Sequence, residues 1–459
     1  MTEINMKYIE SKNKNMTWKN LANFIIPSFI GILLFLVPIE YDGKITVILG
    51  LLSESLQNLL GRYIGYVTTF IFITSAIFSL LYNLAPKRWC DRSPYLHKLF
   101  KTTLVWLVLR VLGGILSTLT LLQIGPEWII GKDTGITAYI EVAGIIFCLI
   151  GVGCLLLPLL TDYGFLEFIG VLFRKGFQKI FGLPGRSTID VLASWVGSSS
   201  IASLLTIKQY ETGFYSMREA SVIVTNFSVV SIPFVVLTAK VAGISEYFLQ
   251  LYGAMIVICV LCAIITPKLP PLSNLPDEYY PPVGKQINEA VCDGGSTYKW
   301  ALEQALKRAA SAPSMGKMLK NGSYSLVDLF FTMMPAAMTI EFLALATYHH
   351  TRIFHVISTP IVPILELLAI PQAYEAAPGV LVGLLDQFVP AIIAGGIENP
   401  LTSFVLAGLS VTQLIFFAEI GILILRSEIP LSAKQLVAIF FIRTIISLPI
   451  LAVIAHMIF

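Results

Sequence analysis

Long apolar runs are the feature that most constrains how this chain can fold. Nine runs are long enough to cross a lipid bilayer as helices, at 21–39, 64–83, 104–124, 137–160, 219–239, 245–266, 326–347, 400–425 and 433–457. A spanning helix needs about 20 predominantly apolar residues, because the hydrocarbon core is about 30 Å thick. Charged residues make up only 13% of the 459 residues, about half of their share in soluble domains. The sequence therefore predicts an all-α integral membrane protein.

The distribution of lysine and arginine predicts the orientation of the spans. With the N-terminus inside, nine crossings place 24 of the 31 basic residues on the cytoplasmic side, in the N-terminal tail, 84–103, 161–186, 208–218, 267–325 and 426–434. Such a bias is typical of cytoplasmic loops. We therefore expect a cytoplasmic N-terminus and an external C-terminus. The formal net charge of +3 is too small to indicate a nucleic-acid partner.

Several segments are expected to lie outside the spans. The stretches 45–61 and 161–181 read as amphipathic helices at the membrane surface. The segment 267–325 opens with "PKLPPLSNLPDEYYPP", a stiff spacer, and continues with "YKWALEQALKRAA", which has helical composition. This segment is either an ordinary linker or a docking or regulatory helix. Cys259 and Cys262 lie within an apolar run, where they act as small apolar groups rather than as a redox or metal site.

Two further apolar stretches, 186–208 and 377–397, are too interrupted by glycine, proline and polar residues to cross simply. Both follow the same order: Pro-Gly, an acid, and then a short polar segment that contains glycine, "GSSS" at 197–200 or "AGGIEN" at 394–399. Irregular backbone is tolerated at membrane depth only where it is buried in protein or lines a wet cavity. We therefore expect each stretch to be a re-entrant hairpin.

A long span follows each hairpin and contains a Thr-amide pair, Thr225-Asn226 or Thr412-Gln413. Three predicted crossings separate the two units, so the second enters the membrane from the opposite face. This order of features predicts an inverted repeat, which is the architecture of many secondary transporters.

The run "PGRSTIDVLASWVGSSS", followed by "REASVIVTNFSVVSIPF", resembles the YjiH-type membrane proteins with nucleoside-recognition (Gate) domains. The resemblance extends over roughly 20–459 and implies the inner (plasma) membrane of a bacterium. It also implies a fold related to concentrative nucleoside transporters, in which two hairpin tips and two unwound helices hold solute and sodium. By resemblance the tips are 197–200 and 394–399, and the unwound helices lie near the two Thr-amide pairs. The Gly-Gln-Thr-Glu-Ala-Pro type of motif of nucleoside transporters is absent, so the fold carries over better than the substrate.

These patterns divide the chain into five predicted segments. They are a cytoplasmic tail at 1–20, scaffold spans at 21–160, a first Gate repeat at 161–266, a linker at 267–325 and a second Gate repeat at 326–459.

Candidate solute- or ion-binding residues are polar groups of the two short polar segments and of the spans that follow them. They are Ser198, Ser199, Ser200, Thr225, Asn226, Ser228, Glu398, Asn399, Thr412, Gln413 and Glu419. The serines and Asn226 have a structural alternative in close helix packing. Glu398 has another, because Asn399 followed by Pro400 is a good start for a helix and an acid beside that start suits the helix dipole.

Three further acids, Asp190, Glu341 and Asp386, are candidate coupling or structural groups. Ionisable groups within spans are costly, which makes Glu341 and Glu419 functional candidates. The structural alternative for these two glutamates is an ion pair with Arg110 or Arg443.

We therefore expect a secondary active transporter of a small polar or charged solute, coupled to a sodium or proton gradient. A dipeptide, an amino acid, a nucleoside and a divalent metal ion all fit the chemistry of the tips. The alternative is a non-transporting Gate component or sensor of a larger membrane assembly. The sequence has no P-loop, G-x-S-x-G, H-E-x-x-H or zinc-finger spacing, so we predict neither an enzyme nor a bound cofactor. The expected partners are the solute and the lipid bilayer, and a homo-oligomer is compatible with the sequence.

Overall fold

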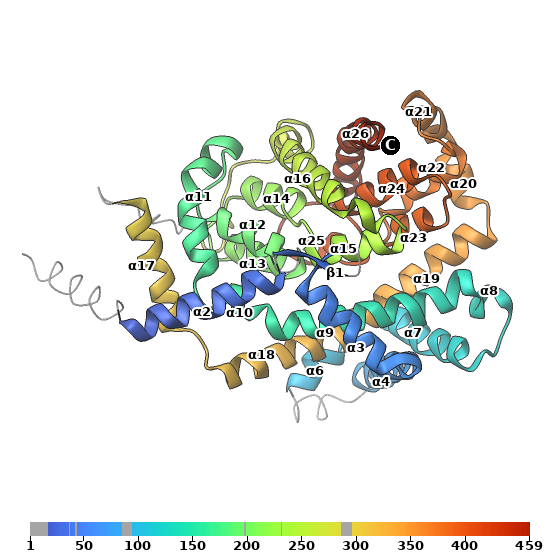
Figure 1. Ribbon diagram of the computed structural model, residues 1–459, viewed down its shortest axis with the longest axis horizontal. Coiled ribbons are helices and arrows are strands. Elements are labelled where there is room, and N and C mark those ends of the chain that lie inside the picture. Colours follow the sequence, from blue (N-terminus) through green and yellow to red (C-terminus); the bar gives the residue numbers. More distant parts are fainter. Residues whose placement is uncertain are drawn as a thin grey trace, which may run out of the picture.

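The computed structural model describes residues 17–35, 37–41, 44–84, 94–196, 199–230, 232–285 and 296–459. The described chain is predominantly helical (Figure 1). The helices of its N-terminal part are α2 (Trp18–Phe35), α3 (Ile48–Leu60), α4 (Ile64–Leu84), α6 (Pro94–Phe100), α7 (Leu104–Leu122), α8 (Glu127–Ile130), α9 (Ala143–Leu156) and α10 (Pro158–Thr161). Two π-helical segments, η2 (Lys132–Val142) and η6 (Leu329–Met333), continue directly into α-helices. Short 3₁₀ helices are η1 (Gly61–Tyr63), η3 (Ser245–Tyr247), η4 (Thr266–Lys268), η5 (Leu272–Asn274) and η7 (Thr359–Ile361).

Seven helical stretches of the described chain are long and apolar enough to cross a membrane. They are Trp18–Phe35, Ile48–Leu84, Leu104–Leu122, Glu127–Thr161, Ser245–Lys268, Met315–His350 and Ala433–Ile458. Each overlaps one of the nine predicted runs. The other two runs, 219–239 and 400–425, are also helical, but each is divided into two shorter helices by a non-helical segment.

The order of elements recurs in the second half of the chain. The first series is α11 (Phe165–Phe181), the pair α12 (Ser187–Val196) and α13 (Ser199–Glu211), the divided helix α14 (Met217–Asn226) and α15 (Ile232–Val241), and the long helix α16 (Phe248–Ile265). The second series is α20 (Ile353–Ser358) and α21 (Val362–Leu367), the pair α22 (Ala373–Val382) and α23 (Val389–Gly395), the divided helix α24 (Pro400–Thr412) and α25 (Ile420–Arg426), and the long helix α26 (Ala433–Ile458). In both series the two helices of the pair pack against each other.

The turn of the second pair differs from the sequence prediction. The chain turns between α22 and α23 at 383–388, whereas 394–399 connects α23 to α24. At the observed turn the Oδ1 atom of Asp386 accepts a hydrogen bond from the Phe388 backbone N–H at 2.8 Å. Pro390 lies in the first turn of α23, where its missing N–H costs nothing. The glycines of "AGGIEN" therefore end a helix instead of forming the tip.

A second difference is a small β-hairpin, which corrects the all-α expectation. Strands β1 (Pro38–Tyr41) and β2 (Lys44–Val47) pair antiparallel, with Pro38 opposite Val47. They lie between α2 and α3, in a stretch that the sequence analysis assigned to the end of one span and the start of a surface helix.

The linker contributes two helices, α17 (Thr297–Ala310) and α18 (Met315–Asp328), and the latter leads through η6 into α19 (Met334–His350). Helix α17 packs against α11 and α2 (Figure 1). The buried face of α17 consists of small side chains, which include Ala301, Ala305 and Ala309. Gly164 lies directly beneath the Ala305 carbonyl and has a φ of 102°, a conformation that favours glycine. The helix with the composition "YKWALEQALKRAA" is thus docked on the helical body.

Figure 1 shows α3, α4, α7, α9 and α18 gathered along one side of the molecule and the elements of the two recurring series along the other. Helices α16, α24 and α26 pack on one another within the second group. Their contact surfaces consist of buried small and aliphatic residues such as Ala254, Ala407 and Leu451.

Candidate functional site

The two divided helices break at the two Thr-amide pairs. Helix α14 ends at Asn226, and the chain is not helical at 227–230. Helix α24 ends at Thr412, and the chain is not helical at 413–416. We call these segments the first and second breaks. A helix that ends leaves its last four carbonyl groups without partners in the helix. Side chains bind some of these carbonyls instead: the Ser228 hydroxyl donates to the Val224 carbonyl, and Arg443 donates to the Thr412 carbonyl.

Arg443 of α26 joins the ends of both divided helices. Its Nη1 donates to the Asn226 Oδ1 at 2.8 Å. Its Nη2 donates to the Thr412 carbonyl at 2.7 Å, and its Nε lies 3.1 Å from the carbonyls of Thr412 and Gln413. The side chain is completely buried. Because helix C-termini carry partial negative charge, they act here as the counter-charge of the guanidinium.

The α12–α13 pair contacts the first break through hydroxyl groups. Ser194 near the end of α12 donates to the Val229 carbonyl at 2.8 Å. Ser203 of α13 and Ser228 lie 2.7 Å apart and share a hydrogen bond. Serines of the run "SWVGSSSIAS" therefore hold the helix pair against the break.

The predicted serine cluster itself is described only in part. Ser199 begins α13 and is buried. Ser198 lies outside the described residues, as does the side chain of Ser200.

The α22–α23 pair contacts the second break in a similar way. Ser410 donates to the Gln387 carbonyl at 2.6 Å, and the Gln413 Nε2 donates to the Val380 carbonyl at 2.9 Å. The backbone N–H groups of Phe417 and Ala418 donate to the carbonyls of Leu384 and Leu385, at 2.8 and 2.9 Å. Each break is thus bound by the helix pair that precedes it in sequence.

Buried polar atoms without partners gather at the turn of the second pair. Glu341 of α19 is completely buried, and neither of its carboxylate oxygens has a hydrogen-bond partner in the described chain. The Gln387 Nε2 and the Gln413 Oε1 also lack partners there. Asp386 interacts electrostatically with both Glu341 and Glu419, and Glu419 is partly buried. A buried carboxylate with no donor is costly unless a proton or cation neutralises it.

The two intramembrane arginines do not neutralise these acids. Arg110 of α7 donates to the Thr332 carbonyl at 3.0 Å, to the Ser79 hydroxyl at 3.0 Å and to the Leu99 carbonyl at 3.3 Å. Arg443 is held by the helix ends described above. Within the described part of the chain, neither arginine forms an ion pair with Glu341 or Glu419. The structural alternative for the two glutamates is therefore wrong.

Asp190 occupies a satisfied position within the first pair. Its Oδ2 accepts hydrogen bonds from the hydroxyls of Tyr215 and Thr206, at 2.8 and 3.2 Å. These bonds connect α12, α13 and the loop before α14.

Glu398 and Asn399 lie away from the buried acids. Glu398 is exposed in the connection between α23 and α24. The Asn399 Oδ1 accepts from the backbone N–H groups of Leu401 and Thr402, at 3.0 and 3.4 Å, with Pro400 at the first helical position. The helix start that the sequence offered as the alternative for Glu398 is confirmed.

Comparison with known proteins relates the first helix pair and the first break to a known family. The profile of the Gate family, described as nucleoside recognition, matches residues 140–245, which include the α12–α13 pair and the first break. The chain is 42% identical over 448 residues to "Uncharacterized protein BpOF4_10220" of Alkalihalophilus pseudofirmus, and the match covers 98% of this chain and 97% of that protein. No solved structure matches the chain.

The fold and the matched region define a helical membrane protein with a Gate nucleoside-recognition domain. The chain belongs to the family of the Alkalihalophilus pseudofirmus protein, which it matches along almost its whole length.

Proposed function

We propose that the chain is a secondary transporter that binds a small polar or charged solute between the two helix pairs and the two breaks. The observation that carries this proposal is the Arg443 bridge, which joins the Asn226 side chain of the first divided helix to the end of the second. Broken helices with carbonyl groups turned inward are the usual solute and ion sites of secondary transporters. The two helix pairs act as re-entrant hairpins that enter from opposite faces of the membrane. The divisions at 161–266 and 326–459 are then two inverted Gate repeats.

The earlier resemblance supports the same proposal. YjiH-type proteins and concentrative nucleoside transporters imply two hairpins and two unwound helices, and the structure has a break at each predicted Thr-amide pair. The Gate description makes a nucleoside the first solute class to test. Amino acids, dipeptides and divalent metal ions remain in the panel because the nucleoside-transporter hairpin motif is absent from the sequence.

The coupling cation binds at Glu341 and Asp386 in this proposal. Both groups are buried, and the Glu341 carboxylate has no hydrogen-bond donor in the described chain. A proton or a sodium ion would remove the cost of that charge. The orphaned Gln387 Nε2 and Gln413 Oε1 offer one donor and one acceptor to the solute. Neutralisation at the acids and binding at the amides would then stabilise the same turn.

The first experiment identifies the solute. Purified protein is heated with representatives of the four solute classes, with and without sodium, at two pH values. Stabilisation by one class, enhanced by sodium or by acidification, is the expected result, because a ligand that binds only the folded state raises its stability. A response to no class, under any cation condition, would favour the non-transporting Gate component.

The second experiment tests the coupling acid in proteoliposomes. Glu341→Gln keeps the size of the side chain but removes its charge, so gradient-driven accumulation of the identified solute should be lost. Solute exchange without a gradient should persist. The matched control is Glu246→Gln, since Glu246 is exposed. Accumulation at the wild-type level in Glu341→Gln would show that the cation binds elsewhere.

A further inference from the structure

A cavity of about 470 Å³ lies away from both breaks. Its wall consists of α9–α10, the start of α11, the base of the α12–α13 pair and the linker helices α17 and α18. Small-molecule sites in proteins have volumes of about 300 to 1,000 Å³. Aliphatic side chains such as Leu157, Leu166 and Leu205 form much of the lining. The cavity is therefore large enough for a small solute with an apolar body.

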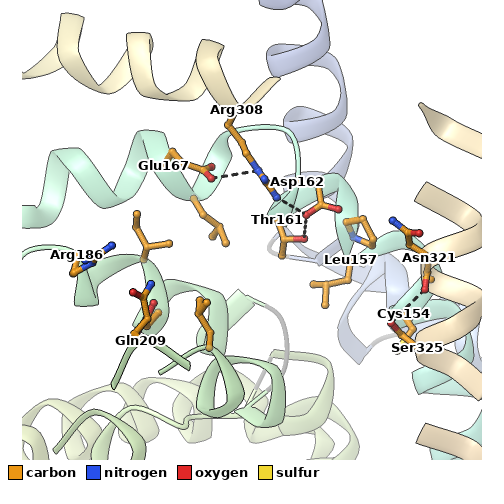
Figure 2. A pocket seen from close by; sticks show the side chains of 16 residues that line it. Cys154, Leu157, Thr161, Asp162, Glu167, Arg186, Gln209, Arg308, Asn321 and Ser325 are labelled. Carbon is orange, nitrogen blue, oxygen red and sulfur yellow. Dashed lines mark hydrogen bonds and ion pairs between the residues drawn. The ribbon is translucent and has the colours of Figure 1, made fainter. Parts of the chain in front are cut away.

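One acid at the rim of this cavity is only half satisfied. Arg308 of α17 contacts the Asp162 Oδ1 through Nη2 at 3.0 Å and the Glu167 Oε1 through Nε at 3.5 Å. The other Glu167 oxygen, Oε2, is buried and has no partner in the described chain. Figure 2 shows the Glu167 carboxylate directed toward Arg308, at the edge of the cavity. A donor on a ligand would complete the hydrogen bonds of this carboxylate.

One cation of the lining is also incompletely satisfied. Arg186, just before α12, stacks on the Phe214 ring with its guanidinium 3.9 Å from the ring centre. Its Nε is buried without a partner, and among the described residues it forms no ion pair. Asp190 interacts electrostatically with Arg186, but its Oδ2 is occupied by Tyr215 and Thr206. Figure 2 shows Arg186 and Glu167 on the same side of the cavity, across from Asn321 and Ser325.

We propose that this cavity is a binding site for a zwitterionic amino acid, whose amino group meets Glu167 and whose carboxylate meets Arg186. A ligand with only one charge would pair with one of these two groups only. The other group, Glu167 Oε2 or Arg186 Nε, would stay desolvated and without a partner, which lowers the binding affinity. The aliphatic lining takes the carbon chain between the two charged ends. Hydrogen bonds to charged groups are the stronger class, so both ends contribute to affinity.

Occupancy of this site would join parts of the molecule that are distant in sequence. The linker supplies Arg308, α11 supplies Glu167, and the turn just before α12 supplies Arg186. None of these residues belongs to either break. The proposal is thus independent of the transport site and is tested by a separate measurement.

The test uses the ω-amino carboxylic acids from glycine to 6-aminohexanoic acid. The distance between the amino group and the carboxylate increases along this series, so the best binder indicates the distance between the two charged groups of the site. Binding to the full-length protein in detergent is measured by isothermal titration calorimetry, with propionate and propylamine as single-charge controls. We expect saturable binding for at least one member of the series and at least about tenfold weaker binding of both controls. Equal binding of a single-charge control, or binding of no member of the series, would overturn the proposal.

Variants assign the two ends. Arg186→Gln and Glu167→Gln should each weaken binding of the best zwitterion by about tenfold or more, whereas Lys175→Gln on the exposed face of α11 should leave it unchanged. Thermal unfolding without ligand shows whether each variant is folded. Transport and zwitterion binding are measured in separate assays, so a failed transport assay and a failed binding assay are distinguishable. Unchanged affinity in folded Arg186→Gln and Glu167→Gln would place the ligand elsewhere.

Discussion

At the scale of single residues, the central group is a buried arginine that has no acidic partner among the described residues. The guanidinium of Arg443 has planar geometry with several N–H donors, so it can reach oxygens of two helices at once. A lysine at this position would keep the charge, but its single nitrogen could not take the place of the three guanidinium nitrogens that donate to Asn226 and to the second break. Arg443 therefore determines how the two breaks lie relative to each other.

Replacing Arg443 by lysine should lower the stability of the folded protein by about 1–3 kcal/mol, because at least one acceptor of the bridge is left buried and unpaired. Thermal unfolding in detergent measures the change. Arg352→Lys is the control, since Arg352 is exposed. An unfolding temperature of Arg443→Lys equal to that of the wild type would mean that the bridge contributes little.

The proposed amino-acid site also has an expected pH dependence. Burial raises the pKa of Glu167 above its usual range, while Arg308 opposes this shift and Asp162 adds to it. The carboxylate form is the one that binds an amino group, so zwitterion affinity should fall as the pH falls through this raised pKa. The loss should begin at a higher pH than for an ordinary glutamate. Titration calorimetry across a pH series measures it, and a pH-independent affinity would argue against a role for Glu167.

At the scale of elements, each helix pair is matched to one break. Gly383 begins the turn of the second pair, and a Cβ atom added there would overlap the Gln413 Oε1. The two segments can approach only because that side chain is missing. The contact between pair and break is therefore close enough to be sensitive to one methyl group.

Gly383→Ala should displace Gln413 and weaken this contact, with a destabilisation of about 1–3 kcal/mol from overpacking. Uptake of the identified solute should fall with it. Gly253→Ala on α16 is the matched control, because an added Cβ there meets no atom within 4 Å. Comparison of the two variants in thermal unfolding separates steric overlap from a general effect of alanine. A Gly383→Ala protein as stable and active as the control would contradict the close contact.

The sequence predicted the elements to different degrees. Hydropathy located the seven long apolar helices, because burial in lipid demands apolar residues along the whole length. The resemblance implied unwound helices near the two Thr-amide pairs, and both breaks lie there. The turn at 383–388 was missed, because "AGGIEN" and the stretch around Asp386 carry similar turn signals and only packing decides between them. The Arg443 bridge was also missed, since its partners Asn226 and Thr412 are distant in the sequence.

At the scale of the whole molecule, the nine proposed crossings require the two chain ends to lie on opposite sides of the membrane. The seven long helices and the two divided helices together would cross it nine times. The distribution of basic residues predicts that the N-terminus lies in the cytoplasm. The linker helices α17 and α18 would lie on the cytoplasmic side as well, together with the amino-acid cavity.

Reporter fusions test this topology in a bacterial host. A fluorescent protein that matures only in the cytoplasm should be bright at the N-terminus, and alkaline phosphatase should be active at the C-terminus. The reverse pair of fusions, with the reporters exchanged, serves as the control. Two ends on the same side would exclude nine crossings.

The way Arg443 is held has an electrical consequence. Dipoles of helix ends and an amide stabilise the guanidinium without removing its charge, so Arg443 keeps a full positive charge. Moving one elementary charge across a membrane potential involves about 2.3 kcal/mol per 100 mV. Any step that carries α26 through part of the membrane field would therefore do electrical work. The rate of that step should depend on voltage even when solute and coupling ion together carry no net charge.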